Sequence, residues 1–312
     1  MKTHRSVAEK VFDIVNICIL IVIMIAASYP LLYIIFSSLS VPSQLAGYNN
    51  ILYRPLGLQF DAYYAVLHNK PILIGYRNTI VYTIVGTSLN LIFTTTLAYA
   101  LSRRGLMLRN SLMIMIVITM FFSGGLIPTY LVMKQLGIVN TWISMVFPGL
   151  IGTYNLIIMR TYFQSIPEAL EESARIDGAS EMKIMVRIMI PLSMPIIAVM
   201  ILYYGVGHWN SWFNASIYLT KSSLYPLQLV LRNILVTGNT DDLLTSLGTI
   251  KGRDMSEIVK SAAIVIATVP ILVLYPFLTE VFRQGCHDRR NKRIRIPNGF
   301  AQDSFFNLHC SG

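Results

Sequence analysis

Charged residues are scarce in this chain. They make up 13% of its 312 residues, whereas a soluble globular domain carries roughly a quarter. Hydrophobic residues make up 54%, and the mean hydropathy is +0.58. This composition excludes an ordinary soluble domain and predicts an integral membrane protein, with a length that suits one membrane domain of several helices.

The residue patterns of several common activities are also missing. There is no Gly-x-x-x-x-Gly-Lys-Ser/Thr sequence, which excludes the usual phosphate-binding loop for ATP. No catalytic Ser/His/Asp set and no metal-ligand set lies in the apolar runs, so we expect no enzyme, no metal and no cofactor. The three cysteines, Cys18, Cys286 and Cys310, have no spacing typical of a disulfide framework. The net charge of +10 comes from basic residues that flank apolar runs, which argues against a nucleic-acid partner.

Long uncharged runs dominate what is present. A helix that crosses a bilayer needs about 20 apolar residues. The first run is too long for the apolar part of a signal peptide, so we expect an uncleaved first span. The sequence therefore predicts an all-α membrane protein with six transmembrane helices, at about 15–36, 78–102, 110–133, 135–159, 188–206 and 261–279.

Lys and Arg accumulate on the cytoplasmic side of membranes, so their distribution predicts the orientation. With both termini inside, the inner segments hold 16 of these residues and the outer segments hold 9. Without the segment after the sixth span, the inner segments hold 10 Lys and Arg residues and the outer segments hold 9. The predicted orientation therefore depends strongly on the basic stretch SRRGLMLR at 102–109. We therefore expect a multi-pass protein of the cell membrane with cytoplasmic N- and C-termini.

One charged stretch, EESARIDGAS at 171–180, interrupts this apolar chain on the predicted cytoplasmic side. Ser165 and Glu168 have the spacing of a capping box, and Glu171 and Arg175 are spaced for an i, i+4 ion pair. Gly178 is a natural helix end, because glycine readily adopts the left-handed conformation found there. The stretch predicts a short acidic helix that ends in a tight turn.

A second short helix follows this turn, with Ser180 or Asp177 as its cap. Helical spacing places four apolar residues on one face, and two prolines then bend the entry into the fifth span; these residues are Met182, Met185, Val186 and Met189, then Pro191 and Pro195. A surface helix lying on lipid also fits this pattern. Against it, three glutamates would face an anionic membrane surface.

The stretch resembles the EAA loop of inner-membrane permease subunits of ATP-binding-cassette (ABC) importers. That motif is Glu-Ala-Ala, three residues, Gly and, nine residues on, an apolar-x-Leu-Pro or similar sequence. Its counterparts here are Glu172, Ser173, Ala174, Gly178 and IMIP at 188–191. Four other stretches are similar to carbohydrate permeases of the maltose-transporter type, and the likeness covers roughly residues 8–285: FFSGGLIPTYLVMKQLGIVNT, GHWNSWFNASIYL, YPLQLVLRNIL and ATVPILVLYPFL.

The resemblance implies a type I ABC importer permease, with an EAA loop at about 161–191 that docks on a cytoplasmic ATPase dimer. It implies two further partners, a second homologous permease subunit and an extracellular solute-binding protein that delivers a sugar or oligosaccharide. The residues expected to couple to the ATPase are Glu171, Glu172, Ser173, Ala174, Asp177 and Gly178. The alternatives are an ion-coupled secondary transporter, which usually keeps ion ligands at the midplane, and an ABC permease for another solute.

The stretch HWNSWFN at 208–214 is the candidate for sugar contact, through Trp209, Asn210 and Asn214. Aromatic faces and amide groups bind carbohydrates, but Trp is also common in the aromatic belt at the membrane interface. Within the spans, neutral residues such as Asn90 and Thr94 are expected to join helices to one another.

Residues 286–312 form a basic tail that departs from the family pattern. One choice of codons for residues 286–293 reads, one base along, as Val-Met-Ile-Gly-Ala-Ile-Lys-Gly, an ending like that of related permeases. We therefore divide the chain into a permease domain at 1–285 and a tail that we expect to be disordered and a frameshift product. Two rival readings are a zinc site and a basic anchor to anionic lipid; the zinc ligands would be Cys286, His287, His309 and Cys310.

Overall fold

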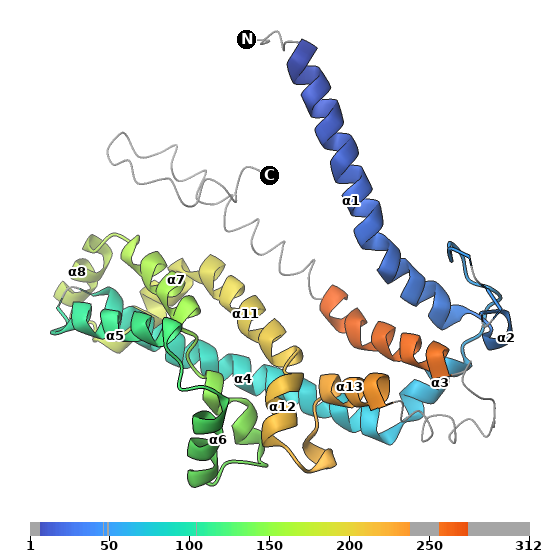
Figure 1. Ribbon diagram of the computed structural model, residues 1–312. Helices are drawn as coiled ribbons and strands as arrows, with labels where there is room; N and C mark the ends of the chain where they lie inside the picture. The colour runs from blue at the N-terminus through green and yellow to red at the C-terminus, as the bar shows by residue number, and fades with distance from the viewer. Residues whose placement is uncertain (1–6, 46, 49, 104, 238–255, 274–312) are drawn as a thin grey trace. The chain divides into compact units, whose positions relative to one another are not determined.

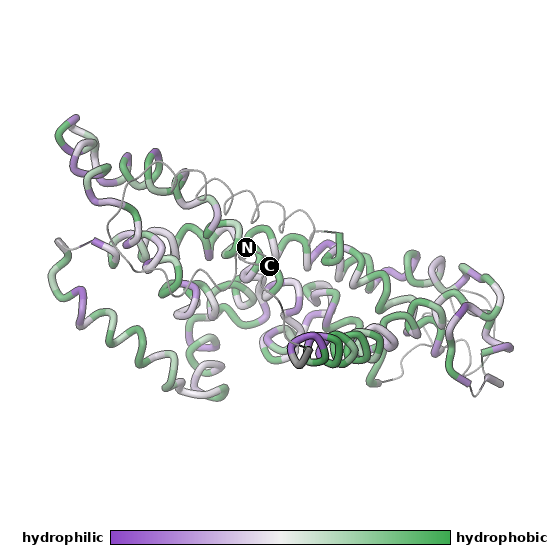
Figure 2. The backbone as a smooth tube through the Cα atoms, turned by 90° about the horizontal axis from the view of Figure 1, so that it is seen from above, coloured by the Kyte–Doolittle hydropathy of each residue, from purple (hydrophilic) through white to green (hydrophobic). Residues whose placement is uncertain are grey.

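Helices form nearly all the regular structure of the computed structural model, which describes residues 7–45, 47–48, 50–103, 105–237 and 256–273 (Figure 1). No β-strand occurs within these ranges, in agreement with the all-α prediction. Hydrophobic residues occupy long stretches of the helices (Figure 2). The chain divides into two compact units, residues 1–73 with 230–269 and residues 74–229 with 270–312.

The first unit contains α1 (Val7–Leu39), α2 (Pro42–Leu45), α3 (Asp61–His68) and most of a helix at Ser256–Val273. The most apolar part of α1 is 0% buried, as expected for a helix whose surroundings are lipid or another chain. Near its end, Ser37 Oγ lies 3.3 Å from Ser261 Oγ. The helix at Ser256–Val273 presents small residues to the core of this unit, among them Ala262 and Ala263.

The second unit is built around α4 (Lys70–Ser102), α7 (Thr153–Gln164) and α11 (Met194–Trp209). Its main core joins fully buried residues of all three helices, including Leu101, Met159, Phe163 and Met200. The remaining helices are α5 (Arg109–Phe121), α6 (Leu126–Gln135), α8 (Ala169–Ile176), α9 (Glu181–Ile184), α10 (Ile190–Leu192), α12 (Trp212–Tyr218) and the first residues of α13 (Leu227–Thr237).

Three of the predicted spans are bent pairs of helices. The third is α5 and α6, which meet at 114° around a glycine pair whose Gly125 has φ +85°. With 13 residues, α5 is about 20 Å long at 1.5 Å per residue, less than the hydrocarbon core of about 30 Å. Two 3₁₀ turns within Trp142–Gly149 precede α7 at 54°, and Glu181–Leu192 precedes α11 at 84°. Three helices are long enough to cross a membrane alone, and the described total reaches six if each bent pair is one span.

Two local predictions were wrong. Ser165 does not cap α8, because its Oγ donates to the Tyr162 carbonyl and closes the end of α7 instead. The four apolar residues after the turn do not share one environment: Met185 and Met189 are buried, whereas Met182 and Val186 are exposed. The residues Met185–Met189 form a π-helical turn, which breaks the α-helical period on which that prediction rested. The tail at 286–312 lies outside the described residues.

Candidate functional site

The segment of residues 165–191 folds as predicted into two short helices around a tight turn. Gly178 has φ +76°, a conformation that glycine adopts without steric cost, and its N–H donates to the Arg175 carbonyl at 3.0 Å. Ser180 caps α9, since its side-chain oxygen accepts from the Lys183 N–H at 3.4 Å. We call α8, the turn and α9 the α8–α9 hairpin.

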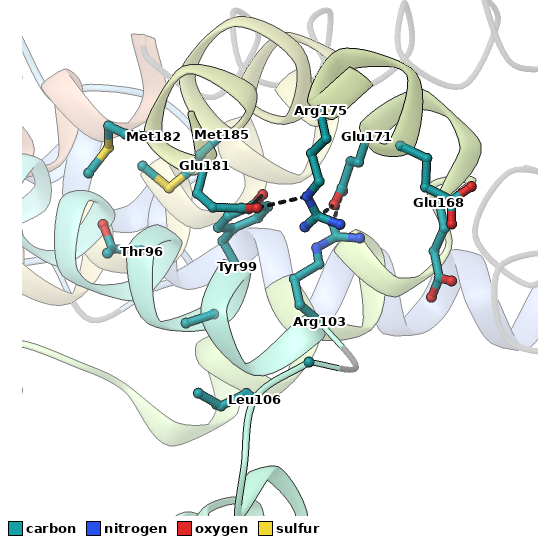
Figure 3. Close-up of a pocket in the computed structure, with 13 residues that line it drawn as sticks. Thr96, Tyr99, Arg103, Leu106, Glu168, Glu171, Arg175, Glu181, Met182 and Met185 are labelled. Atoms are coloured by element: carbon teal, nitrogen blue, oxygen red, sulfur yellow. Dashed lines mark hydrogen bonds and ion pairs between the residues drawn. The ribbon is translucent and has the colours of Figure 1, made fainter. Parts of the chain in front are cut away.

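Two neighbouring glutamates of α8 have opposite surroundings. Glu172 is exposed, whereas Glu171 is 2% exposed and turned toward the end of α4 (Figure 3). There Arg103, the residue directly after α4, places Nη2 at 2.5 Å from Glu171 Oε1. The expected i, i+4 partner, Arg175, is more distant, with Nη2 at 3.9 Å from Glu171 Oε2. The strong partner of Glu171 therefore comes from a distant helix.

A second connection joins α4 to α9. Tyr99 donates its hydroxyl proton to Glu181 Oε2 at 2.8 Å, and Arg175 Nε donates to Glu181 Oε1 at 2.7 Å. The Arg103 guanidinium lies 5.0 Å from the centroid of the Tyr99 ring, within the range of a cation–π contact. We call Tyr99, Arg103, Glu171, Arg175 and Glu181 the ionic cluster (Figure 3).

The ionisation of Glu171 reflects its position in this cluster. Burial raises the pKa of the Glu171 carboxyl above its ordinary value, because removal from water disfavours the charged form. The guanidinium groups of Arg103 and Arg175 act in the opposite direction and offset part of this rise. Glu171 is therefore a carboxylate whose charge depends on its two arginines.

The hairpin also carries exposed residues, some of them apolar. Ile176 is 86% exposed and Met182 is 61% exposed, while Glu172 and Asp177 supply negative charge nearby. A cavity of about 530 Å3 opens between the end of α4 and the hairpin, and carboxylates and methionines both line it. Exposed apolar residues ringed by polar ones are typical of a protein-binding surface.

The predicted coupling residues do not all have the same role in the fold. Glu171 faces inward, Ala174 packs against the core, and Ser173 donates its hydroxyl proton to the Leu170 carbonyl. Glu172, Asp177 and Gly178 are exposed. Four residues that the structure places here were not predicted from the sequence: Tyr99, Arg103, Ile176 and Glu181. A basic residue directly after a span is a weak signal for Arg103, but its partner 68 residues later cannot be found by local spacing.

The candidate sugar-contact residues lie at the end of α11 and in α12. Trp209 is 6% exposed, its ring meets Tyr76 edge-on, and its Nε1 has no hydrogen-bond partner among the described residues. Asn210 is exposed and accepts weakly from Gln228 Nε2 at 3.5 Å, and Asn214 is exposed on α12. The exposed amides are thus accessible to a ligand, whereas the Trp209 ring is enclosed by protein.

A neutral polar network lies next to these residues, between the middle of α4 and α11. Asn90 donates through Nδ2 to the Gly149 and Leu150 carbonyls, and its Oδ1 lies 2.6 Å from His208 Nε2. Thr94 Oγ1 and Tyr204 Oη are 2.7 Å apart. As predicted, Asn90 and Thr94 join segments of the chain that are distant in sequence.

The family of the chain follows from comparison with known proteins. Residues 71–288 match the family model described as the binding-protein-dependent transport system inner membrane component. The chain belongs to this family. Its members are permease components of transport systems, which places the α8–α9 hairpin in a transporter and not in an enzyme.

Individual relatives agree with this assignment. The chain is 41% identical over 288 residues to protein LplC of Bacillus subtilis (strain 168), covering 90% of this chain and 95% of that protein. It is 35% identical over 279 residues to the polygalacturonan/rhamnogalacturonan transport system permease protein YtcP of the same organism, covering 89% and 96%. A chain of a bacterial ABC transporter involved in the import of the acidic polysaccharide alginate superposes with a TM-score of 0.84 and 32% identity, covering 90% of this chain and all of that chain.

Proposed function

We propose that this chain is the permease subunit of an ATP-driven importer that carries oligosaccharides across the cell membrane. It forms part of the translocation path together with a second, similar permease. Two ATPase subunits on the cytoplasmic side supply the free energy, and an extracellular solute-binding protein delivers the sugar. Family membership favours this function over an ion-coupled carrier.

The observation that carries the proposal is the α8–α9 hairpin, which contacts the end of α4 through the ionic cluster and also carries exposed apolar and acidic residues. Ile176 and Met182 present apolar surface beside the acidic Glu172. A short amphipathic element of this kind suits insertion into a groove of a partner protein. We propose that the ATPase provides this groove and that basic residues at the edge of the groove contact the acidic residues of the hairpin.

The cargo is proposed to be an acidic oligosaccharide. YtcP is named for polygalacturonan and rhamnogalacturonan, and the superposed transporter takes part in alginate import. Both names refer to polysaccharides rich in uronic acids, whose short fragments are anionic oligosaccharides. Asn210 and Asn214 would donate amide hydrogen bonds to the hydroxyl and carboxylate groups of such a cargo.

Purification of the tagged chain from its native host tests the assembly. We expect a cassette ATPase and a second permease to co-purify in mild detergent. Ile176→Asp and Glu172→Lys should each reduce the retained ATPase, because one places a charge in an apolar contact and the other reverses a charge. Met107→Asp is the control, since Met107 is 87% exposed and lies outside the hairpin. Equal retention by all three variants would contradict the docking role.

Orientation and cargo need separate measurements. A cysteine at position 60 should react with an impermeant thiol reagent in intact cells, and one at position 106 should not; reaction at 106 would overturn the orientation. Uptake of labelled trigalacturonate should exceed that of neutral maltotriose. The opposite ranking would keep the permease function and reject the acidic cargo.

A further inference from the structure

Arg103 and Glu171 form a buried ion pair between the end of α4 and the first helix of the α8–α9 hairpin. Their side chains are 14% and 3% exposed. Removal of two charges from water costs several kcal/mol, so a buried ion pair is often no more stabilising than apolar side chains of similar volume. Moreover, Arg103 Nε makes no hydrogen bond to any described residue. Stability alone therefore explains this pair poorly.

The pair is an ionic contact, since Glu171 Oε1 makes no hydrogen bond to any described residue, and a second contact joins the hairpin to the same end of α4. Glu171 attaches α8 to Arg103, and Glu181 attaches α9 to Tyr99 only four residues earlier in the chain. Arg175 bonds to Glu181 and also approaches Glu171, which closes the ionic cluster. Both helices of the hairpin thus contact the end of α4, α8 through an ion pair and α9 through a hydrogen bond.

The covalent connections from the hairpin to its flanking helices are less direct. On one side, Ser165–Glu168 separates α7 from α8. On the other side, the π-helical turn at Met185–Met189 and an 84° bend near Ser193 separate α9 from α11. In contrast, α4 is a continuous helix of 33 residues that ends at Ser102, directly before Arg103. The ion pair therefore gives a displacement of the hairpin a direct path into α4, beside the apolar contacts of the main core.

The middle of α4 contacts the segments on which a movement of this helix would act. Asn90 holds the Gly149 and Leu150 carbonyls and His208, and Thr94 contacts Tyr204. A shift of α4 along its axis would therefore act on the chain around Gly149 and on α11, whose end carries Asn210.

We propose that Arg103 is a positioning residue for transport, which carries the ATP-driven movement of the α8–α9 hairpin into α4 through its ion pair with Glu171. This inference rests on the proposed function, since it requires an ATPase docked on the exposed residues of the hairpin. It assigns Glu171 to transmission within the chain and leaves docking to Glu172, Ile176 and Met182.

The deciding variant is Arg103→Met with Glu171→Leu in the purified complex. It removes both charges together, so no unpaired charge remains buried, and apolar replacements of this kind are commonly neutral or stabilising. We expect normal assembly and normal retention of the ATPase. We also expect loss of the movement of α4. Two opposite charges attract each other and so resist being displaced, whereas apolar side chains lack this attraction.

Movement of α4 is measured with an environment-sensitive fluorophore on Ser88→Cys in a background without Cys18, Cys286 and Cys310. Ser88 is exposed and lies about 21 Å from Ser102 along α4 at 1.5 Å per residue. ATP with vanadate should change the fluorescence of the otherwise unaltered complex. In the double variant this response should fall by about 5-fold or more, the lower end of typical coupling effects. Arg103→Lys keeps the positive charge but lacks the planar guanidinium group. Its fluorescence response should lie between those of the original chain and the double variant.

The outcomes distinguish the proposed role of the Arg103–Glu171 pair from the proposed function of the chain. A full response in the double variant would overturn the role of the pair, and so would loss of the ATPase from that variant, since the pair would then serve docking. Arg187→Met, which removes an exposed arginine after the hairpin, should leave the response unchanged; a loss there equal to that of the double variant would also overturn the proposal. Absence of any ATPase from the chain with Arg103 and Glu171 intact would instead refute the proposed function.

Discussion

Two stretches of α4 hold the second unit together with different chemistry. The middle stretch, from Gly86 to Thr94, uses a close helix contact and neutral hydrogen bonds, several of them to backbone carbonyls. The end stretch, from Tyr99 to Arg103, uses formal charges. Ionised groups are costly at the depth of the hydrocarbon core and cheaper near water, which explains this division along one helix.

The difference also separates packing from transmission. In the middle stretch, α4 and α11 pack closely, because the His208 ring of α11 occupies the space that a side chain at Gly86 would fill. The end stretch contacts the α8–α9 hairpin, which carries the exposed Ile176. We infer that the middle stretch sets how α4 packs against α11, and that the end stretch sets how α4 responds to the ATPase.

The largest expected effect comes from the middle stretch. In Gly86→Leu, a Cβ would lie 2.5 Å from His208 Nε2 and 2.8 Å from its Cδ2, so the His208 ring or the two helices must shift. Overpacking of this kind costs about 1–3 kcal/mol. The purified variant should melt at a lower temperature in fluorescence-detected size-exclusion chromatography.

Gly207→Leu is the matched control for this prediction. Gly207 lies on α11, next to His208, and a Cβ added there would meet nothing within 4 Å. Its melting temperature should stay close to that of the original chain. Equal losses at both glycines would show that the close contact with His208 does not hold the two helices together.

The next effect concerns the hairpin attached to the end stretch. Gly178→Val places a β-branched residue at φ +76°, where non-glycine residues lose roughly 1–2 kcal/mol. The turn should open, so that transport and transport-linked ATP hydrolysis fall while membrane insertion stays normal. Gly105→Val, with no positive φ and nothing within 4 Å, controls for the added bulk. Uptake equal to the control would remove Gly178 from coupling.

A smaller effect is expected at the exposed amides beyond the middle stretch. Asn210→Ala removes a side chain whose hydrogen bond within the described part of the chain is a weak one from Gln228, so assembly should be unaffected. Loss of one hydrogen bond to the cargo, worth about 0.5–1.5 kcal/mol, would lower uptake about two- to tenfold. Trp209→Ala is a less direct test, because this side chain is buried and its removal leaves a cavity. Unchanged uptake in Asn210→Ala and Asn214→Ala would favour an interfacial role.

Sequence patterns predicted the local features of these regions well. Glycine chemistry predicted the turn at Gly178, and the prolines predicted the bend before α11. These features depend on a few adjacent residues, so local steric rules suffice. The same rules failed at Ser165, whose hydroxyl donates to the Tyr162 carbonyl at the end of α7 and does not cap α8.

Contacts between distant segments could not be predicted in this way. Glu171 was expected on the docking surface because it belongs to an acidic helix, yet it faces Arg103 from another helix. The sequence spacing to Arg175 pointed to a partner, and that partner is the more distant of the two. Trp209, a candidate for sugar contact, is enclosed by protein, with its ring edge-on to Tyr76. In each case the three-dimensional neighbour decides the role, and a single sequence does not contain that information locally.

The smallest expected effect tests whether the basic tail acts on the acidic hairpin. Residues 286–312 carry Arg289, Arg290, Lys292, Arg293 and Arg295, charges that would attract Glu172 if the tail were a working part of the protein. We expect otherwise, because residues 286–293 are compatible with the ending of related permeases read in a frame shifted by one base.

Deletion after Gly285 should therefore leave uptake and ATPase retention unchanged, within the error of paired assays. A zinc site at Cys286, His287, His309 and Cys310 predicts that the deletion abolishes zinc binding, and a lipid anchor predicts weaker binding to anionic vesicles. Resequencing of codons 284–294 decides the origin of the tail. If the shifted frame does not encode Val-Met-Ile-Gly-Ala-Ile-Lys-Gly, the frameshift proposal is wrong. An effect of the deletion on uptake would then indicate that the basic residues of the tail act on the acidic hairpin.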